Sequence, residues 1–147
     1  MIIIEPRVKQ LLIDDALDTF PDECCGFLFG REEHDGTRIV IDILVVDNSK
    51  AGDKSRRFEI SPSDYLTAEQ HALDHDWTLL GIYHSHPKHP AIPSEHDRVA
   101  AQPYFSYVII SIPDKINHDA INFRSWLLND DRQFEEENIS DYSIINK

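Results

Sequence analysis

Basic residues are scarce in this chain of 147 residues, which carries 14 lysines and arginines against 27 aspartates and glutamates. The resulting formal charge of −13 repels phosphate groups, which argues against a nucleic-acid partner and against docking on anionic membranes. The chain also lacks any apolar run near the roughly 18 residues that a membrane-spanning helix requires. We therefore expect neither nucleic acid nor membrane among its partners.

Cysteine is rare as well, since the only two in the sequence are the neighbours Cys24 and Cys25. Adjacent cysteines close almost no loop, so a disulfide cannot staple this fold, and we expect both thiols to be free and buried. The stretch Met1–Pro6 lacks the basic and long apolar regions of a signal peptide. These features predict a cytoplasmic protein.

Hydrophobic residues make up 41% of the chain, which is enough for a folded core in a sequence of one domain's length. The sequence shows no internal repeat, low-complexity tract or linker. We expect one domain over residues 1–147, with an acidic C-terminal segment at 129–147.

Hydrophobic spacing and turn signals predict an α/β domain in which three helices pack against a mixed sheet of six to eight strands. The expected helices cover residues 6–18, 61–75 and 94–101. The expected strands cover residues 1–4, 24–30, 38–46, 58–60, 77–86, 104–112 and 120–128, with one more around 133–139.

Histidine is crowded, because four of the eight in the chain lie between His84 and Asp97. Side chains alternate along a strand, so Leu80, Ile82, His84 and His86 are expected to share one face, the first two in the core. Two imidazoles at a strand end form a bidentate site for a metal such as Zn²⁺. Asp97 can supply a third ligand if the intervening loop folds back, leaving the open position that marks catalytic zinc sites.

Other interpretations of these residues remain open from spacing alone. Ser94 and Asp97 also form the S-x-x-D pattern of a helix capping box. His89 and His96 are further candidate ligands, although His96 would point to a different side of the helix from Asp97. Glu23 stands at the head of an apolar strand, where capping or solvation of the strand entry accounts for it.

The combined motif resembles that of the JAMM, or MPN-plus, zinc metalloproteases, which pair an upstream glutamate with H-x-H-P and S-x-x-D. His84–Pro87 with Ser94 and Asp97 fit this pattern, and Glu23–Gly30 is similar to the glutamate-bearing strand of the family. The resemblance covers about residues 5–128.

The resemblance implies a cytidine-deaminase-like α/β fold and hydrolysis of a peptide or isopeptide bond. It implies one Zn²⁺ per chain, bound by His84, His86 and Asp97. It also implies that Glu23 is the general base, which then passes its proton to the leaving amine. Ser94 would donate a hydrogen bond to the oxyanion.

The chain is similar to the compact prokaryotic members, since it has no cysteine after Cys25 for a second, cysteine-containing zinc site. Those members are associated with cleavage after the Gly-Gly tail of ubiquitin-like or sulfur-carrier proteins, which we expect as the substrate and partner. The main alternative is a non-catalytic MPN-type binding scaffold, although such scaffolds usually lack motif residues. A zinc deaminase is disfavoured because its H-x-E…P-C-x-x-C signature is absent. A thiol protease using Cys24 or Cys25 is a remote alternative.

Overall fold

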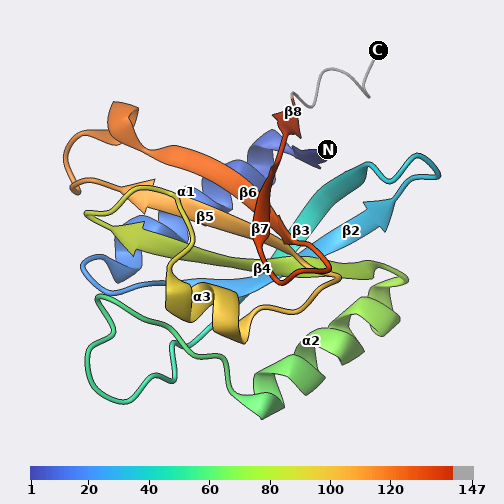
Figure 1. Ribbon diagram of the computed structural model, residues 1–147, viewed down its shortest axis with the longest axis horizontal. Coiled ribbons are helices and arrows are strands. Elements are labelled where there is room, and N and C mark those ends of the chain that lie inside the picture. Colours follow the sequence, from blue (N-terminus) through green and yellow to red (C-terminus); the bar gives the residue numbers. More distant parts are fainter. Residues whose placement is uncertain (141–147) are drawn as a thin grey trace.

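The computed structural model describes residues 1–140, which form one eight-stranded sheet flanked by helices (Figure 1). The strand order is β7-β6-β5-β4-β2-β3-β1-β8. β4 pairs with β5 in parallel and β1 with β3 and β8 in parallel, whereas the remaining neighbours are antiparallel. The strands are β1 (Ile2–Ile4), β2 (Cys25–Glu32), β3 (Arg38–Val46), β4 (Thr78–Pro87), β5 (Ser106–Ile112), β6 (Asn122–Leu128), β7 (Phe134–Glu137) and β8 (Ile139–Ser140). The expected mixed α/β architecture is confirmed.

The helices cover two separate hydrophobic cores. α1 (Pro6–Thr19) contributes to a core with β1 and β5, and α2 (Pro62–His75) packs on Phe27 and Phe29 of β2 in the other core. In Figure 1, α1 runs behind the sheet. The short α3 (Glu95–Ala100) and the 3-10 turn η1 (His118–Ala120) complete the set. Among the described residues, no helix has the length and apolar character to cross a membrane.

Local sequence signals explain several element boundaries. α2 begins after Ser61, whose side chain accepts the Asp64 N–H, and it ends at Asp76 in the left-handed conformation. The hairpin between β2 and β3 turns at Gly36, where φ is 88° and glycine avoids the strain of a side chain. These elements confirm the predicted second helix and the predicted hairpin.

The expected strand at residues 58–60 is wrong. Glu59 donates its N–H to the Asn48 side chain at 3.1 Å, and its carbonyl accepts from Ser49 N at 2.9 Å. Both backbone hydrogen-bonding groups of Glu59 are therefore paired with loop residues and not with a strand. Without a neighbouring strand to continue the ladder, the apolar segment stays irregular and supplies Phe58 and Ile60 to the α2 core.

The prediction that residues 80, 82, 84 and 86 share one face of the sheet is also wrong, because Leu80 faces the other way. The register between β2 and β4 shifts between Leu28 and Phe29, which leaves Leu80 without a partner on β2. Such a bulge reverses the side-chain alternation on one side of it. Leu80 therefore packs in the α1 core, while Ile82 packs in the α2 core.

The predicted strand around residues 133–139 is divided at Asn138 between the two ends of the sheet. β7 pairs with β6, and β8 pairs with β1. The Asn138 carbonyl accepts a hydrogen bond from Ile2 N at 2.9 Å. The sheet therefore curls so that its two edge strands, β7 and β8, are connected through Asn138. Residues 141–147 of the acidic C-terminal segment, including Asp141, lie outside the described residues.

Candidate metal centre

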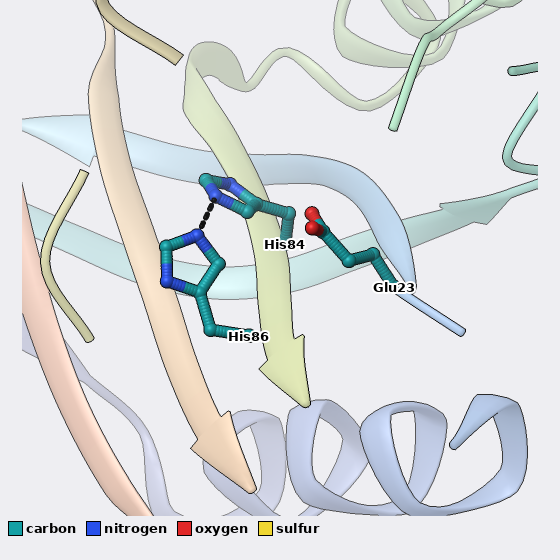
Figure 2. Close-up of side chains that lie close together, drawn as sticks. All are labelled: Glu23, His84 and His86. Atoms are coloured by element: carbon teal, nitrogen blue, oxygen red, sulfur yellow. Dashed lines mark hydrogen bonds between the residues drawn. The ribbon is translucent and has the colours of Figure 1, made fainter. Parts of the chain in front are cut away.

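The end of β4 brings His84 and His86 together. They are 1% and 7% exposed, and their Nε2 atoms lie 3.1 Å apart (Figure 2). β4 lies between β2 and β5 in the sheet, which excludes solvent from the base of the site. Phe58 stacks on His84, with ring centroids 4.4 Å apart. The two imidazoles are thus fixed side by side in a buried position.

Asp97 reaches the same point from the N-terminal turn of α3. Its Oδ2 lies 3.3 Å from Nε2 of both His84 and His86. The same oxygen accepts the Ser94 N–H at 2.9 Å, and Ser94 Oγ accepts the Asp97 N–H at 3.0 Å. The capping box and the histidine cluster therefore share one carboxylate, so these two interpretations of Asp97 are compatible.

The proline-rich loop between β4 and α3 is held by hydrogen bonds that fold it back. Lys88 N donates to Ile112 O at 2.8 Å, and Trp126 Nε1 donates to Ala91 O at 3.0 Å. The Pro90 carbonyl lies 2.8 Å from His86 Nδ1. This last contact places a proton on Nδ1 and leaves Nε2 free as a lone-pair donor in the neutral ring.

Glu23 joins the site through strand pairing. Cys25 of β2 lies opposite His84, and Ser85 N bonds Cys24 O at 3.2 Å, so the residue before β2 falls near the histidines. Glu23 is 3% exposed, and its carboxylate points toward His84 in Figure 2. One ligand atom each from Glu23, His84 and His86 lie within 4.8 Å of one another. No local spacing links Glu23 to the histidines, and only the family motif singled it out.

Burial and neighbouring charge set the protonation of the cluster. Burial raises the pKa of Glu23 to about 8. Burial disfavours the ionised form of Asp97 too, but the two imidazoles and the Ser94 N–H outweigh it and lower the pKa of that carboxyl. Burial lowers the pKa of His84. For His86 burial acts in the same direction, yet Asp97, the Pro90 carbonyl and Glu23 together raise its pKa.

The donor set fits a zinc ion. The three contacts among His84 Nε2, His86 Nε2 and Asp97 Oδ2 measure 3.1, 3.3 and 3.3 Å. In a tetrahedral zinc site with ligand distances of about 2.0–2.1 Å, neighbouring ligand atoms lie about 3.3–3.4 Å apart. Within residues 1–140, the buried Glu23 Oε1 has no hydrogen-bond partner, as expected of a carboxylate awaiting a ligand. His84 Nδ1 is likewise unpartnered among the described residues, so of the two rings only that of His86 is oriented by a hydrogen bond at Nδ1.

His89 and His96 lie apart from this cluster. His96 Nδ1 is 2.9 Å from Arg57 Nη1, and His89 is exposed beside the site. Both line a cleft of about 760 Å³, whose lining also includes Glu23, His86 and Ser94. A second pocket of about 300 Å³ borders His84 and Asp97 from another side, with Phe58, Tyr65 and Tyr107 in its wall. His96 lines both spaces, which therefore flank the cluster.

The two cysteines are buried, as the sequence predicts. Burial raises the pKa of Cys24 well above its usual range and that of Cys25 to about 12. A thiol with so little thiolate at neutral pH is a poor nucleophile, which disfavours the thiol-protease alternative.

Comparison with known sequences agrees with the motif. The family described as prokaryotic homologs of the JAB domain matches residues 5–129. A CysO-cysteine peptidase from Mycobacterium tuberculosis is 26% identical over 125 residues, which cover 84% of this chain and 82% of the relative. A desampylase from Pyrococcus furiosus is 35% identical over 75 residues, covering 51% of this chain and 49% of the relative.

Comparison with solved structures supports the fold. A protein from Desulfitobacterium hafniense superposes with a TM-score of 0.84 and 31% identity, covering 96% of this chain and 92% of the other. A JAB1/MPN domain protein from Archaeoglobus fulgidus gives a TM-score of 0.55 at 19% identity, covering 96% and 98%. Because its sequence identity is only 19%, this second structure supports the fold and nothing further.

Proposed function

Because the chain belongs to the family of prokaryotic homologs of the JAB domain, we propose that it is a zinc-dependent peptidase or isopeptidase. The observation that carries this proposal is the convergence of two imidazoles and one carboxylate at coordination spacing, with Glu23 beside them. In this proposal His84, His86 and Asp97 hold one Zn²⁺ per chain. When bound, Zn²⁺ would polarise the scissile carbonyl and lower the pKa of a water molecule to about 7.

Glu23 is assigned as the general base. Glu23 lines the cleft, and its buried Oε1 has no hydrogen-bond partner among the described residues, so this oxygen has an unused lone pair for a proton. Burial raises the pKa of this carboxyl to about 8 in the metal-free protein, and a bound cation would lower it, so that Glu23 can accept a proton as the carboxylate and return it as the carboxyl. Glu23 then delivers that proton to the leaving amine.

Ser94 is assigned as the oxyanion donor. Its Oγ already accepts the Asp97 N–H at 3.0 Å, which fixes the position of the oxygen and leaves its own proton free to donate. The residue lines the same cleft as Glu23. A hydroxyl prepositioned in this way stabilises negative charge that develops on the carbonyl oxygen.

For the substrate we propose the Gly-Gly tail of a ubiquitin-like or sulfur-carrier protein, cleaved in the cytoplasm. The names of two relatives, a CysO-cysteine peptidase and a desampylase, support a peptidase or isopeptidase of this class. An extended tail of two glycines also suits a centre whose ligand side chains are 1–8% exposed.

The test is incubation of the zinc-loaded protein with sulfur-carrier proteins that bear C-terminal extensions, read by mass spectrometry. We expect release of the extension and a Gly-Gly terminus. The Glu23→Gln variant should keep near-stoichiometric zinc and lose hydrolysis. Purified protein that binds no zinc would contradict the proposal. Protein that binds zinc and the carrier without cleaving any extension would favour the scaffold alternative.

A further inference from the structure

A cluster of basic residues lies beside the proposed active site of this acidic chain. Four of its 14 lysines and arginines lie between Lys50 and Arg57, in a loop with a single acidic residue. Three of them, Lys50, Arg56 and Arg57, line the cleft that contains Glu23 and Ser94. The fourth, Lys54, is not part of the cleft lining.

Asn48 holds this loop against the site. Its Nδ2 donates to Glu23 O at 3.1 Å and to Arg57 O at 3.0 Å, and its Oδ1 accepts from Lys50 N and Glu59 N at 3.0 and 3.1 Å. The Glu23 N–H in turn donates to a loop carbonyl, that of Lys54, at 2.8 Å. The position of the basic side chains is therefore tied to the backbone of the proposed catalytic residue.

Two of the three cations in the cleft remain available to a ligand. Lys50 pairs with Glu59 at 3.3 Å. Arg57 contacts the ring of His96 at 2.9 Å, and within residues 1–140 neither Arg56 nor Arg57 forms an ion pair with a carboxylate. Both arginines are exposed. They leave guanidinium donors free for an anion, which arginine binds through two parallel hydrogen bonds.

Apart from Glu23, the acidic residues that line the cleft are already engaged. Asp53 accepts hydrogen bonds from Ser55 N at 2.9 Å and Ser55 Oγ at 2.5 Å. Glu95 pairs with Arg98 of its own helix. Neither carboxylate bonds to Arg56 or Arg57, so the loop keeps an excess of positive charge where it faces the cleft.

The position of Glu23 indicates which part of a substrate would contact the basic residues of the cleft. The proton that Glu23 returns goes to the leaving amine, so the leaving group departs on the Glu23 side, into the basic cleft. The second pocket, with Phe58 and Tyr107 in its wall, has no lysine or arginine in its described lining. The acyl part of the substrate would then lie on the side of this second, less polar pocket.

We infer that Arg56 and Arg57, assisted by Lys50, form an anion-binding subsite for the α-carboxylate of the leaving group. The substrate class is then a carrier protein extended by one amino acid or a short peptide with a free C-terminus, in preference to an isopeptide-linked lysine within a folded protein. The α-carboxylate of a leaving amino acid lies next to the amine that Glu23 would protonate, and both arginines line the same cleft as Glu23. This inference rests on the proposed function, whose general base defines the leaving-group side.

Binding tests the subsite without turnover. Zinc-loaded Glu23→Gln protein is titrated with a fluorescent peptide ending in Gly-Gly-Ala, as the free acid and as the C-terminal amide. We expect the acid to bind at least fivefold more tightly, and the double variant Arg56→Gln/Arg57→Gln in the same background to lose that preference. Lys54→Gln is the matched control, because it removes one positive charge from the same loop outside the cleft lining, and it should keep the preference.

Equal affinity for acid and amide, or a preference that survives in the double variant, would overturn the subsite. The second result would assign the carboxylate to the metal.

Cleavage separates this inference from the proposed function. With carriers extended by Gly-Gly-Ala as acid or amide, wild-type enzyme should favour the acid in kcat/KM, and the double variant should cleave both equally. Equal cleavage by the wild type contradicts the subsite and leaves the peptidase intact. Absence of cleavage alongside an acid preference in binding contradicts the peptidase and leaves the subsite.

Discussion

At the scale of single residues, Asp97 combines two tasks in one side chain. Its Oδ2 closes the capping box with Ser94 N at 2.9 Å and contacts both imidazoles at 3.3 Å. The backbone hydrogen bond fixes the rotamer of the carboxylate without a metal ion. A ligand that is already ordered loses little conformational entropy on binding.

Replacing Ser94 separates capping from catalysis. Ser94→Ala removes the acceptor for the Asp97 N–H and should lower the free energy of unfolding by about 1 kcal/mol. Loss of the proposed oxyanion donor should lower kcat about 10²–10³-fold. Ser61→Ala is the matched control, because it removes the equivalent cap of α2 and should cost similar stability with kcat unchanged. If both variants keep full kcat in the carrier cleavage assay, Ser94 is only a cap.

Zinc retention should depend on pH through the imidazoles. The pKa of His86 is raised in the metal-free protein, so protons compete for its Nε2 as the pH falls through a value above 6.5, while Asp97 stays ionised. Competition with a chelator should show an apparent zinc affinity that does not change at high pH and decreases as the pH falls towards the raised pKa of His86. Full zinc occupancy at pH 4 would contradict His84 and His86 as ligands.

At the scale of elements, the loop from Asn48 to Glu59 depends on one amide. Asn48→Ala removes four hydrogen bonds, two of them to Glu23 O and Arg57 O. We expect a loss of about 1–3 kcal/mol in the free energy of unfolding and a lower kcat/KM for carrier cleavage. Ser49→Ala is the control in the same loop, since its exposed hydroxyl bonds only Glu59 O at 3.0 Å and should matter much less. Similar melting temperatures for both variants, measured by calorimetry, would argue against this anchoring role.

Local sequence patterns predicted the positions of helices and strands far better than they predicted how the strands pair. The cap at Ser61 and the H-x-H strand depend on neighbouring residues, so the sequence locates α2 and β4 closely. The bulge at Leu80 arises from the register with β2, which no local pattern encodes. For the same reason Glu23, separated by about 60 residues from His84, could be placed at the site only through its resemblance to a known motif.

At the scale of the whole molecule, a buried carboxylate links the last strands to the middle of the sheet. Glu137 of β7 is 6% exposed, and its Oε1 accepts from Ser106 Oγ and Ser125 Oγ at 2.9 Å each. Ser106 also accepts from the buried Arg38 at 2.9 Å. One network of hydrogen bonds therefore connects β3, β5, β6 and β7.

Breaking this network should weaken the entire fold. Glu137→Ala leaves the buried hydroxyls of Ser106 and Ser125 without their acceptor, and we expect a loss of about 2–4 kcal/mol in the free energy of unfolding. Glu136→Ala is the control, because Glu136 lies on the exposed side of the same strand and pairs with Arg124 at 3.1 Å. Chemical denaturation curves that coincide for the two variants would contradict a structural role for Glu137.

The joining of β7 and β8 through Asn138 also bears on how the protein behaves at high concentration. A sheet normally ends in strands whose free N–H and C=O groups can recruit strands from other molecules. β7, which forms one edge, has only four residues and so offers a short template. The short β7 edge therefore limits edge-to-edge pairing with strands of other molecules.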